Sequence, residues 1–358
     1  MIKANLSALT FMEEKQDDLA RKMLLRYFEL LPEHKKIFSA PEREKKSLQD
    51  FKYHLHYLSN ASLSDSPTLF VEYVSWARIL FQNLHLPEKM LHASLKSMFD
   101  VLKAEMSSDD FGFVEESLIH ALSHLESAYE VPDSFVTEHE HSSLAKKYVD
   151  LLLAGKRKEA VTFILDTVKQ NKITIKDLYL KVFQQTQREI GLLWQTNEIS
   201  VAQEHFATAV TQLIMAQLYP KIFVTEKTGY TMVATCIADE LHEMGVRMVA
   251  DFFEMEGWDT YYVGANVPVE SILATLREKA PHILAISATM TFHIREVQRL
   301  ISMIRALPEF NNTKIMVGGY PFLIDGLLWK KVGADGFAPD AQEAIAVASS
   351  LVEEHLHE

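Results

Sequence analysis

The chain has 358 residues, of which 48% are hydrophobic, so it is long enough for two or three domains, each with its own core. Its 49 acidic residues outnumber 36 basic ones, and a formal net charge of −13 disfavours nucleic-acid binding. A single cysteine, Cys236, excludes an intramolecular disulfide. With no visible leader and no apolar run of transmembrane length, we expect a cytoplasmic protein that binds neither nucleic acid nor membrane.

Residues 1–135 are predicted to form an all-helical domain. Prolines and polar turns separate five expected helices, at 12–31, 42–60, 67–84, 87–105 and 110–130. Aromatic residues recur there at spacings of three or four, as a buried helix face requires. This amount of helix is compatible with a globin-like, all-α domain.

A second helical domain is expected at 142–222, after a linker at 131–141. Its four predicted helices are 143–154, 157–170, 173–194 and one that begins at Ser200, with Gly155 as the break between the first two. Ser200 and Gln203 fit a capping box at the start of the fourth helix. These helices predict a four-helix bundle.

Residues 229–358 alternate between apolar, β-branched runs and amphipathic segments, as in an α/β fold. The expected strands are 231–237, 259–264, 282–288, 314–318 and 336–338, and the expected helices are 245–256, 268–279, 292–306, 322–331 and 340–354. Five parallel strands with right-handed crossovers give a flavodoxin-like (Rossmann-type) sheet. Because such sheets bind ligands at their carboxyl edge, His242, Ser287 and Gly318 are expected to lie at a binding site.

Three short segments lie at or just after the ends of the first, third and fourth expected strands, with 41 residues between the first two segments and 28 between the last two. They are Glu240-Leu241-His242-Glu243-Met244-Gly245, then Ser287-Ala288-Thr289, then Gly318-Gly319. The pattern resembles the cobalamin-binding domain of methionine synthases, corrinoid carriers and B12 light sensors, over roughly residues 230–354.

The resemblance implies a role for each motif residue. His242 would be the lower axial ligand of the cobalt of cobalamin, and Glu240, where many relatives have Asp, would accept the other ring N–H and fix the tautomer. Gly245 would let the corrin approach the backbone. The slot for the displaced nucleotide tail would be lined by Ser287, Thr289, Gly318 and Gly319.

A further pattern lies in the helical domain before this motif. Trp194 is followed, after nine residues, by Glu204-His205, which resembles the signature of adenosylcobalamin photoreceptors. The resemblance implies that Trp194 packs against the upper ligand, Glu204 hydrogen-bonds the adenosyl group and His205 supports it. Gln195 stands where the DNA-binding members have a histidine, so the upper ligand after photolysis is left open.

A helical module ahead of a B12 module resembles the photocobilins, which hold biliverdin beside cobalamin; residues 69–77 look similar to that family. Candidates for a bilin site, by residue type alone, are His54, His56, Tyr57, Tyr73 and Trp76. Cys236 lies on a predicted strand of the α/β domain, so a bilin would bind without a cysteine tether. A globin-like pocket could equally hold haem, or nothing.

The function implied by these resemblances is a light sensor and not an enzyme. The four-helix bundle at 142–222 resembles the cap that covers the upper face of the corrin in methionine synthases and light sensors. Light would break the cobalt–carbon bond of adenosylcobalamin, and this cap would then repack and change the state of a homo-oligomer that signals to a separate effector protein. The alternatives are a corrinoid methyl-carrier protein of a B12-dependent methyltransferase system, a haem-based gas sensor and a B12 sensor that works in the dark.

Overall fold

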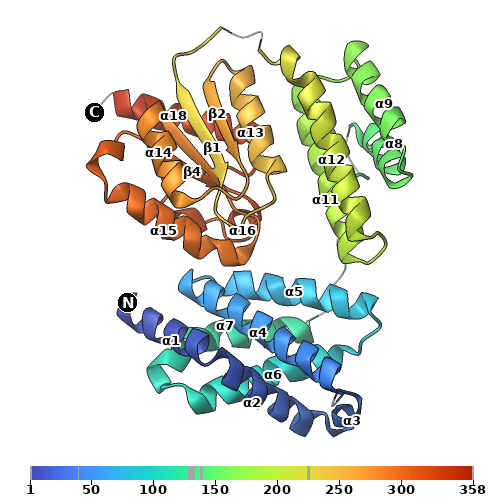
Figure 1. The fold of residues 1–358 in the computed structure, drawn as a ribbon, viewed down its shortest axis with the longest axis vertical. Coiled ribbons are helices and arrows are strands. Elements are labelled where there is room, and N and C mark those ends of the chain that lie inside the picture. The colour runs from blue at the N-terminus through green and yellow to red at the C-terminus, as the bar shows by residue number, and fades with distance from the viewer. Residues whose placement is uncertain (1, 39, 128–133, 138–139, 224–225, 357–358) are drawn as a thin grey trace. The chain divides into compact units, whose positions relative to one another are not determined.

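The computed structural model describes residues 2–38, 40–127, 134–137, 140–223 and 226–356 (Figure 1). The chain divides into two compact units: residues 1–131 with 324–331, and residues 132–323 with 332–358. The predicted linker lies partly outside the described residues, at 131–133 and 138–139. Within the described ranges, no helix combines the length and the apolar composition needed to cross a membrane.

The first unit is helical, as predicted. Its helices are α1 (Ile2–Glu14), α2 (Gln16–Leu30), α3 (Lys35–Phe38), α4 (Pro41–Leu63), α5 (Pro67–Asn83), α6 (Glu88–Glu105), α7 (Ser108–Glu126) and α17 (Leu328–Lys331). Helices α4 and α5 begin with proline. Proline lacks a backbone N–H, but it is tolerated there because the N–H groups of the first turn have no acceptor within the helix. Ser107 caps α7 by accepting a hydrogen bond from the backbone N–H of Asp110 at 3.2 Å. The globin-like character of this unit stays a prediction.

One expected helix, 12–31, is wrong at its start. The chain leaves helical geometry at Lys15, whose ψ of 14° ends one helix and begins the next. The break allows two apolar faces to be buried, that of α1 through Leu9 and Met12 and that of α2 through Leu19 and Met23.

The second unit begins with a helical cap. Its helices are α8 (Ser142–Leu153), α9 (Arg157–Lys169), α10 (Ile175–Asp177), a π-helical turn (Leu178–Phe183), α11 (Gln184–Gln195) and α12 (Val201–Leu218). Gly155 takes a φ of +69° in the turn between α8 and α9, and the Ser200–Gln203 capping box is present, as the sequence predicted. The π-helical turn was not predicted; it inserts one extra residue per turn and buries Tyr179.

A parallel five-stranded sheet follows the cap, in the predicted flavodoxin-like order β2-β1-β3-β4-β5. Its strands are β1 (Thr231–Cys236), β2 (Asp259–Gly264), β3 (Ile283–Ser287), β4 (Lys314–Gly318) and β5 (Gly336–Phe337). Its helices are α13 (Met244–Met255), α14 (Val269–Lys279), α15 (Ile294–Arg305), α16 (Tyr320–Ile324) and α18 (Ala341–Leu356). Helices α13 and α18 pack on one face of the sheet, and α14 and α15 cover the other (Figure 1).

The single helix expected at 322–331 is wrong, because α16 ends at Ile324 and α17 starts only at Leu328. Asp325 ends α16 by accepting a hydrogen bond from the backbone N–H of Leu327 at 2.9 Å, and Gly326 occupies the turn. A side chain that binds the backbone two residues on stabilises a turn at the expense of helix.

The cap and the sheet share a hydrophobic core. Met248 and Phe252 of α13 belong to the same buried cluster as Tyr148 and Tyr179 of the cap. The Tyr179 hydroxyl also donates to the buried Asp251 carboxylate of α13 at 2.8 Å. The cap is therefore packed against the helix that follows the His242 loop.

Candidate functional site

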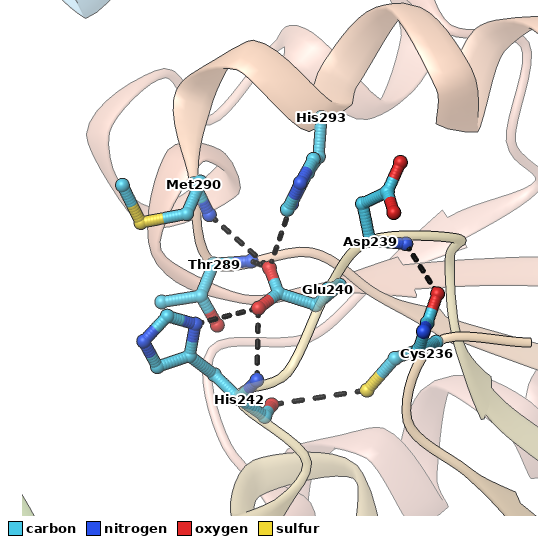
Figure 2. Close-up of polar contacts among 8 residues, drawn as sticks. Cys236, Asp239, Glu240, His242, Thr289, Met290 and His293 are labelled. Carbon is cyan, nitrogen blue, oxygen red and sulfur yellow. Dashed lines mark hydrogen bonds and ion pairs between the residues drawn. The ribbon is translucent and has the colours of Figure 1, made fainter.

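The loop after β1 holds a buried acid and an exposed imidazole side by side (Figure 2). Glu240 is fully buried, whereas the side chain of His242 is 60% exposed. Glu240 Oε1 accepts two hydrogen bonds from His242, one from the backbone N–H at 2.9 Å and one from Nδ1 at 2.5 Å. The carboxylate thus holds the Nδ1 proton and leaves Nε2 free to bind a metal, as predicted for a carboxylate–histidine pair.

The second oxygen of Glu240 accepts hydrogen bonds from the loop that follows β3, the strand next to β1. Oε2 accepts from the backbone N–H of Thr289 at 2.5 Å, from that of Met290 at 3.3 Å and from Nδ1 of His293 at 3.0 Å. His293 was missed by sequence reasoning, because it stands 53 positions from Glu240 and no local pattern links the two.

These contacts set the protonation of the pair. Burial alone would raise the pKa of the Glu240 carboxyl, but hydrogen bonds from His242, His293 and the backbone lower it well below its ordinary value. The same Glu240 contact raises the pKa of His242, against an opposing effect of burial. Glu240 is therefore ionised and accepts a hydrogen bond from the His242 ring.

The glycines of the motif have different structural roles. Gly319 has a φ of +109°, and a Cβ there would lie 2.0 Å from the carbonyl oxygen of Ala288, so only glycine lets these two loops approach. A Cβ on Gly318 would meet nothing closer than 3.9 Å, and one on Gly245 would meet nothing within 4 Å. The space beside Gly245 is open, as expected if a ligand is to approach the backbone there.

Two buried polar atoms near this edge of the sheet have no hydrogen-bond partner within the described residues. Ser287 ends β3 and pairs in register with Gly318, which ends β4. On the turn that follows, Thr291 Oγ1 and His293 Nε2 are buried without a hydrogen-bond partner within the described ranges. The backbone N–H of Thr289, by contrast, already binds Glu240. This edge therefore combines an exposed imidazole with buried polar atoms that a ligand could satisfy.

Two polar residues of cap helix α12, Glu204 and Gln212, interact with the same loop. The charge of Glu204, in the first turn of α12, contributes to the raised pKa of His242. Farther along α12, Gln212 donates to Glu243 Oε1 at 2.9 Å, while Tyr262 donates to Glu243 Oε2 at 2.8 Å.

The other two residues of the cap signature are more exposed. Trp194, in the last turn of α11, is 44% exposed. His205 hydrogen-bonds the neighbouring Glu204 through Nδ1 and is otherwise largely open to solvent. Of the three signature residues, Glu204 is the one that the structure links to His242.

The candidates of the first unit gather in one aromatic cluster. His54 is buried, and its Nδ1 lies 2.8 Å from the hydroxyl of Tyr73, which stacks on Tyr57 at a ring-centroid distance of 3.8 Å. Trp76 stacks on the same Tyr73 at 6.3 Å, whereas His56 is exposed. Burial lowers the pKa of His54 to about 4, so this side chain is neutral at physiological pH.

Comparison with known proteins identifies the second unit. Residues 230–346 match a family model described as a B12 binding domain, and residues 144–219 match a second model with the same description. This part of the chain is a B12-binding region. The corrinoid cofactor predicted from the His242 motif is thereby confirmed, whereas the adenosyl form and biliverdin stay predictions.

Similar proteins are themselves corrinoid proteins. The chain is 25% identical over 169 residues to dimethylamine corrinoid protein 2 of Methanosarcina mazei, covering 46% of this chain and 77% of that protein. It is 24% identical over 213 residues to the dimethylamine corrinoid protein of Methanosarcina barkeri, covering 58% and 97%. The solved monomethylamine corrinoid protein of Methanosarcina barkeri has a similar fold, with a TM-score of 0.52, 19% identity and coverage of 60% and 99%.

The residues present fit a corrinoid. His242 would hold the cobalt of a corrinoid through Nε2, because Glu240 occupies Nδ1 and the imidazole is exposed. The nearby Cys236 does not compete, because burial raises the pKa of its thiol to about 12 and keeps it protonated. The open space at Gly245 and the unpartnered polar atoms of Thr291 and His293 are available to the rest of the cofactor.

Proposed function

We propose that this chain is a corrinoid carrier that binds cobalamin between its cap and its sheet, with His242 as the lower ligand of cobalt, and that it presents a methyl group to a partner methyltransferase without being an enzyme itself. The Glu240–His242 pair at the carboxyl edge of the sheet carries the proposal. The similarity to corrinoid proteins favours a carrier over the light sensor that the sequence suggested.

Each part of the site has a role in this proposal. Glu240 orients His242 and keeps its proton on Nδ1, so that Nε2 is the atom that meets cobalt. Bound cobalamin would supply a cobalt atom able to accept and release a methyl group. The cap would shield the bound cofactor on the side away from His242. It would have to move aside for a partner, and this movement would break contacts such as the hydrogen bond from Gln212 to Glu243.

The proposal is tested by comparing two forms of the cofactor. A carrier should bind methylcobalamin and adenosylcobalamin with similar affinity, should accept a methyl group from a chemical donor when reduced, and should keep its oligomeric state under green light. His242→Ala should lower affinity for both forms and remove the histidine ligand. A strong preference for adenosylcobalamin together with a light-driven change of oligomer would contradict the carrier.

A second candidate is an adenosylcobalamin light sensor with biliverdin as an additional chromophore. The observation in its favour is the position of Glu204, whose charge reaches His242 from the cap helix that also carries His205. For this candidate, Trp194→Ala and Glu204→Gln would weaken the binding of adenosylcobalamin but not of methylcobalamin. Illumination would then change cap packing and oligomeric state, and biliverdin would add a red absorption band.

A further inference from the structure

We propose that residues 134–137 form a strap that holds the cap closed, and that Glu189 of α11 is the residue that binds this strap to the cap. In the sequence, the strap follows the boundary between the two units, at the start of the second. The inference rests on the proposed binding of cobalamin between cap and sheet. It goes beyond that function by naming a segment outside the corrinoid motifs that controls how readily the cap opens.

Glu189 accepts one hydrogen bond from the strap on each of its carboxylate oxygens. Oε1 accepts from the hydroxyl of Ser134 at 3.0 Å, and Oε2 accepts from the backbone N–H of Phe135 at 2.7 Å. Glu189 lies on cap helix α11 and is only 8% exposed. Within the described residues this carboxylate makes no other hydrogen bond, so a buried acid of the cap has its acceptors satisfied by the strap alone.

The strap depends on such contacts because it belongs to no helix or strand. Its Val136 is 4% exposed and lies in the same core cluster as Ile190, the residue after Glu189. Within the strap, the Thr137 hydroxyl donates to the Ser134 carbonyl at 2.8 Å and closes a turn. The strap is therefore held on the cap by one carboxylate and one apolar side chain, and loss of the carboxylate should release it.

Hydrogen bonds between α11 and α12 connect the helix under the strap with the corrinoid site. The side chain of Gln187 on α11 donates to Thr211 at 3.0 Å and accepts from Thr208 at 3.0 Å. Thr208 also lies 3.1 Å from Glu204, whose charge acts on His242. A strap bound to α11 therefore opposes movement of this helix pair away from the loop after β1.

Substitution of Glu189 should release the strap. Glu189→Leu removes both acceptors at a similar side-chain volume, so the fraction of molecules with an open strap should rise at least about tenfold. Ser134→Ala removes one of the two hydrogen bonds and should have a smaller effect in the same direction. Glu189→Gln is the matched control, because its carbonyl oxygen can accept from Phe135 and its NH2 group can donate to the Ser134 hydroxyl. This variant should keep the strap bound.

Chymotrypsin cleavage after Phe135, in the full chain without cobalamin, measures release of the strap. The protease cuts after aromatic residues, and the buried Val136 makes this peptide bond accessible only when the strap leaves the cap. Where opening is fast relative to cleavage, the rate of cleavage follows the open fraction. Mass spectrometry identifies the product that begins at Val136, and Glu189→Leu should form it at least about tenfold faster than wild type.

A second control removes a linker contact at the surface of the same cap. Glu140 is an exposed residue that accepts from Lys181 of the π-helical turn at 2.9 Å. Because exposed ion pairs contribute little to stability, Glu140→Gln should be cut after Phe135 at close to the wild-type rate.

The kinetics of cobalamin exchange measure whether the strap holds the cap closed. With the strap released the cap should open more often, so Glu189→Leu should take up and release methylcobalamin at least about tenfold faster. The two rates should rise by the same factor and leave the dissociation constant unchanged, because the strap would stabilise the closed cap with and without cofactor. A role in stability alone would lower the thermal midpoint without moving the two rates together.

The outcomes separate this proposal from the proposed function. The strap does not hold the cap if Glu189→Leu is cut after Phe135 at the wild-type rate, or if it is cut faster while methylcobalamin exchange is unchanged. If Glu189→Leu does not fold, Ser134→Ala decides: cleavage and exchange that both rise at least about twofold support the proposal, and a wild-type value for either overturns it. His242→Ala should lose affinity for methylcobalamin while its cleavage after Phe135 stays at the wild-type rate; full affinity would overturn the proposed cobalt ligand instead.

Discussion

At the scale of single residues, the site depends on a charge that is buried and fully hydrogen-bonded. Glu240 is out of contact with solvent, yet it stays ionised because N–H donors surround both of its oxygens. The carboxylate can hold His242 in one orientation because its own position is determined by β1, β3 and the turn before α15.

Glu240→Gln should therefore damage both the apo protein and its cofactor binding. In the wild type, N–H donors face both carboxylate oxygens. The amide replaces one of these oxygens with an NH2 group, so at least one buried donor loses its acceptor, at a cost of about 1–3 kcal/mol. We expect a lower thermal midpoint without cobalamin and affinity for cobalamin reduced about tenfold or more. Calorimetric titration measures the affinity, and wild-type values for both quantities would show that the charge is unimportant.

Two glycines of the motif should respond in opposite ways to alanine. Gly319→Ala places a Cβ against the Ala288 carbonyl at a positive φ, so the apo protein should lose about 1–3 kcal/mol of stability or more. Gly245→Ala has open space in the first turn of α13 and should make the apo protein slightly more stable. If the corrin approaches there, Gly245→Ala should nevertheless bind cobalamin more weakly; unchanged binding would place the corrin elsewhere.

At the scale of elements, the cap is fixed to α13 by a hydrogen-bonded pair inside a shared core. Tyr179 belongs to the π-helical turn, which places its hydroxyl on Asp251. Burial raises the pKa of Asp251 to about 6, above the 3.8 of an exposed aspartate. The folded state therefore holds this proton more tightly than the unfolded state.

The sign of the resulting pH dependence follows from linkage. A raised folded-state pKa contributes stability that is present below about pH 4 and is lost as the pH rises through about 6. The shift of about two units corresponds to an effect on the order of 2–3 kcal/mol. Asp251→Asn, which keeps an acceptor for Tyr179 and has no proton to lose, should therefore stabilise the cap–α13 packing at pH 8 but not at pH 4.

Hydrogen exchange of peptides from α13 and the π-helical turn would measure this difference. The matched control is Asp150→Asn, since Asp150 lies on the exposed side of α8 in the same cap. A stabilisation by Asp251→Asn that is equal at both pH values would contradict the raised pKa.

At the scale of the whole molecule, the two B12-binding matches lie almost entirely in the second unit, apart from residues 324–331. Those eight residues belong to the first unit, where Asp325 accepts a hydrogen bond from Ser66 at 2.8 Å. The residues of the candidate site, from Trp194 to Gly319, all belong to the second unit.

A chain limited to residues 132–358 should bind cobalamin through His242 with nearly full affinity. It should be less stable, because the segment 324–331, including the fully buried Leu328, loses its packing partners. The cobalamin spectrum and the thermal midpoint measure these two effects. Folded, truncated protein that fails to bind cobalamin would assign part of the site to the first unit, and biliverdin uptake by it would place a bilin outside the His54 cluster.

The sequence by itself determined the elements whose signals are local. Alternating strands and helices predict the parallel sheet, Ser200 and Gln203 predict the start of α12, and Glu240 two residues before His242 predicts the carboxylate–histidine pair. Such features depend on hydrogen bonds and side-chain periodicity within a few residues, so the order of residues suffices to predict them.

Only the tertiary structure decided the features that join distant parts of the chain. His293 meets Glu240 because parallel strands bring their carboxyl ends to one edge of the sheet, and nothing in the sequence between them records that approach. The burial of Asp251 by Tyr179, and the contact that makes Gly319 obligatory, likewise arise from packing between elements. Contacts of this kind depend on the fold as a whole, because the burial and hydrogen bonding of each residue are set by elements that are distant in the sequence.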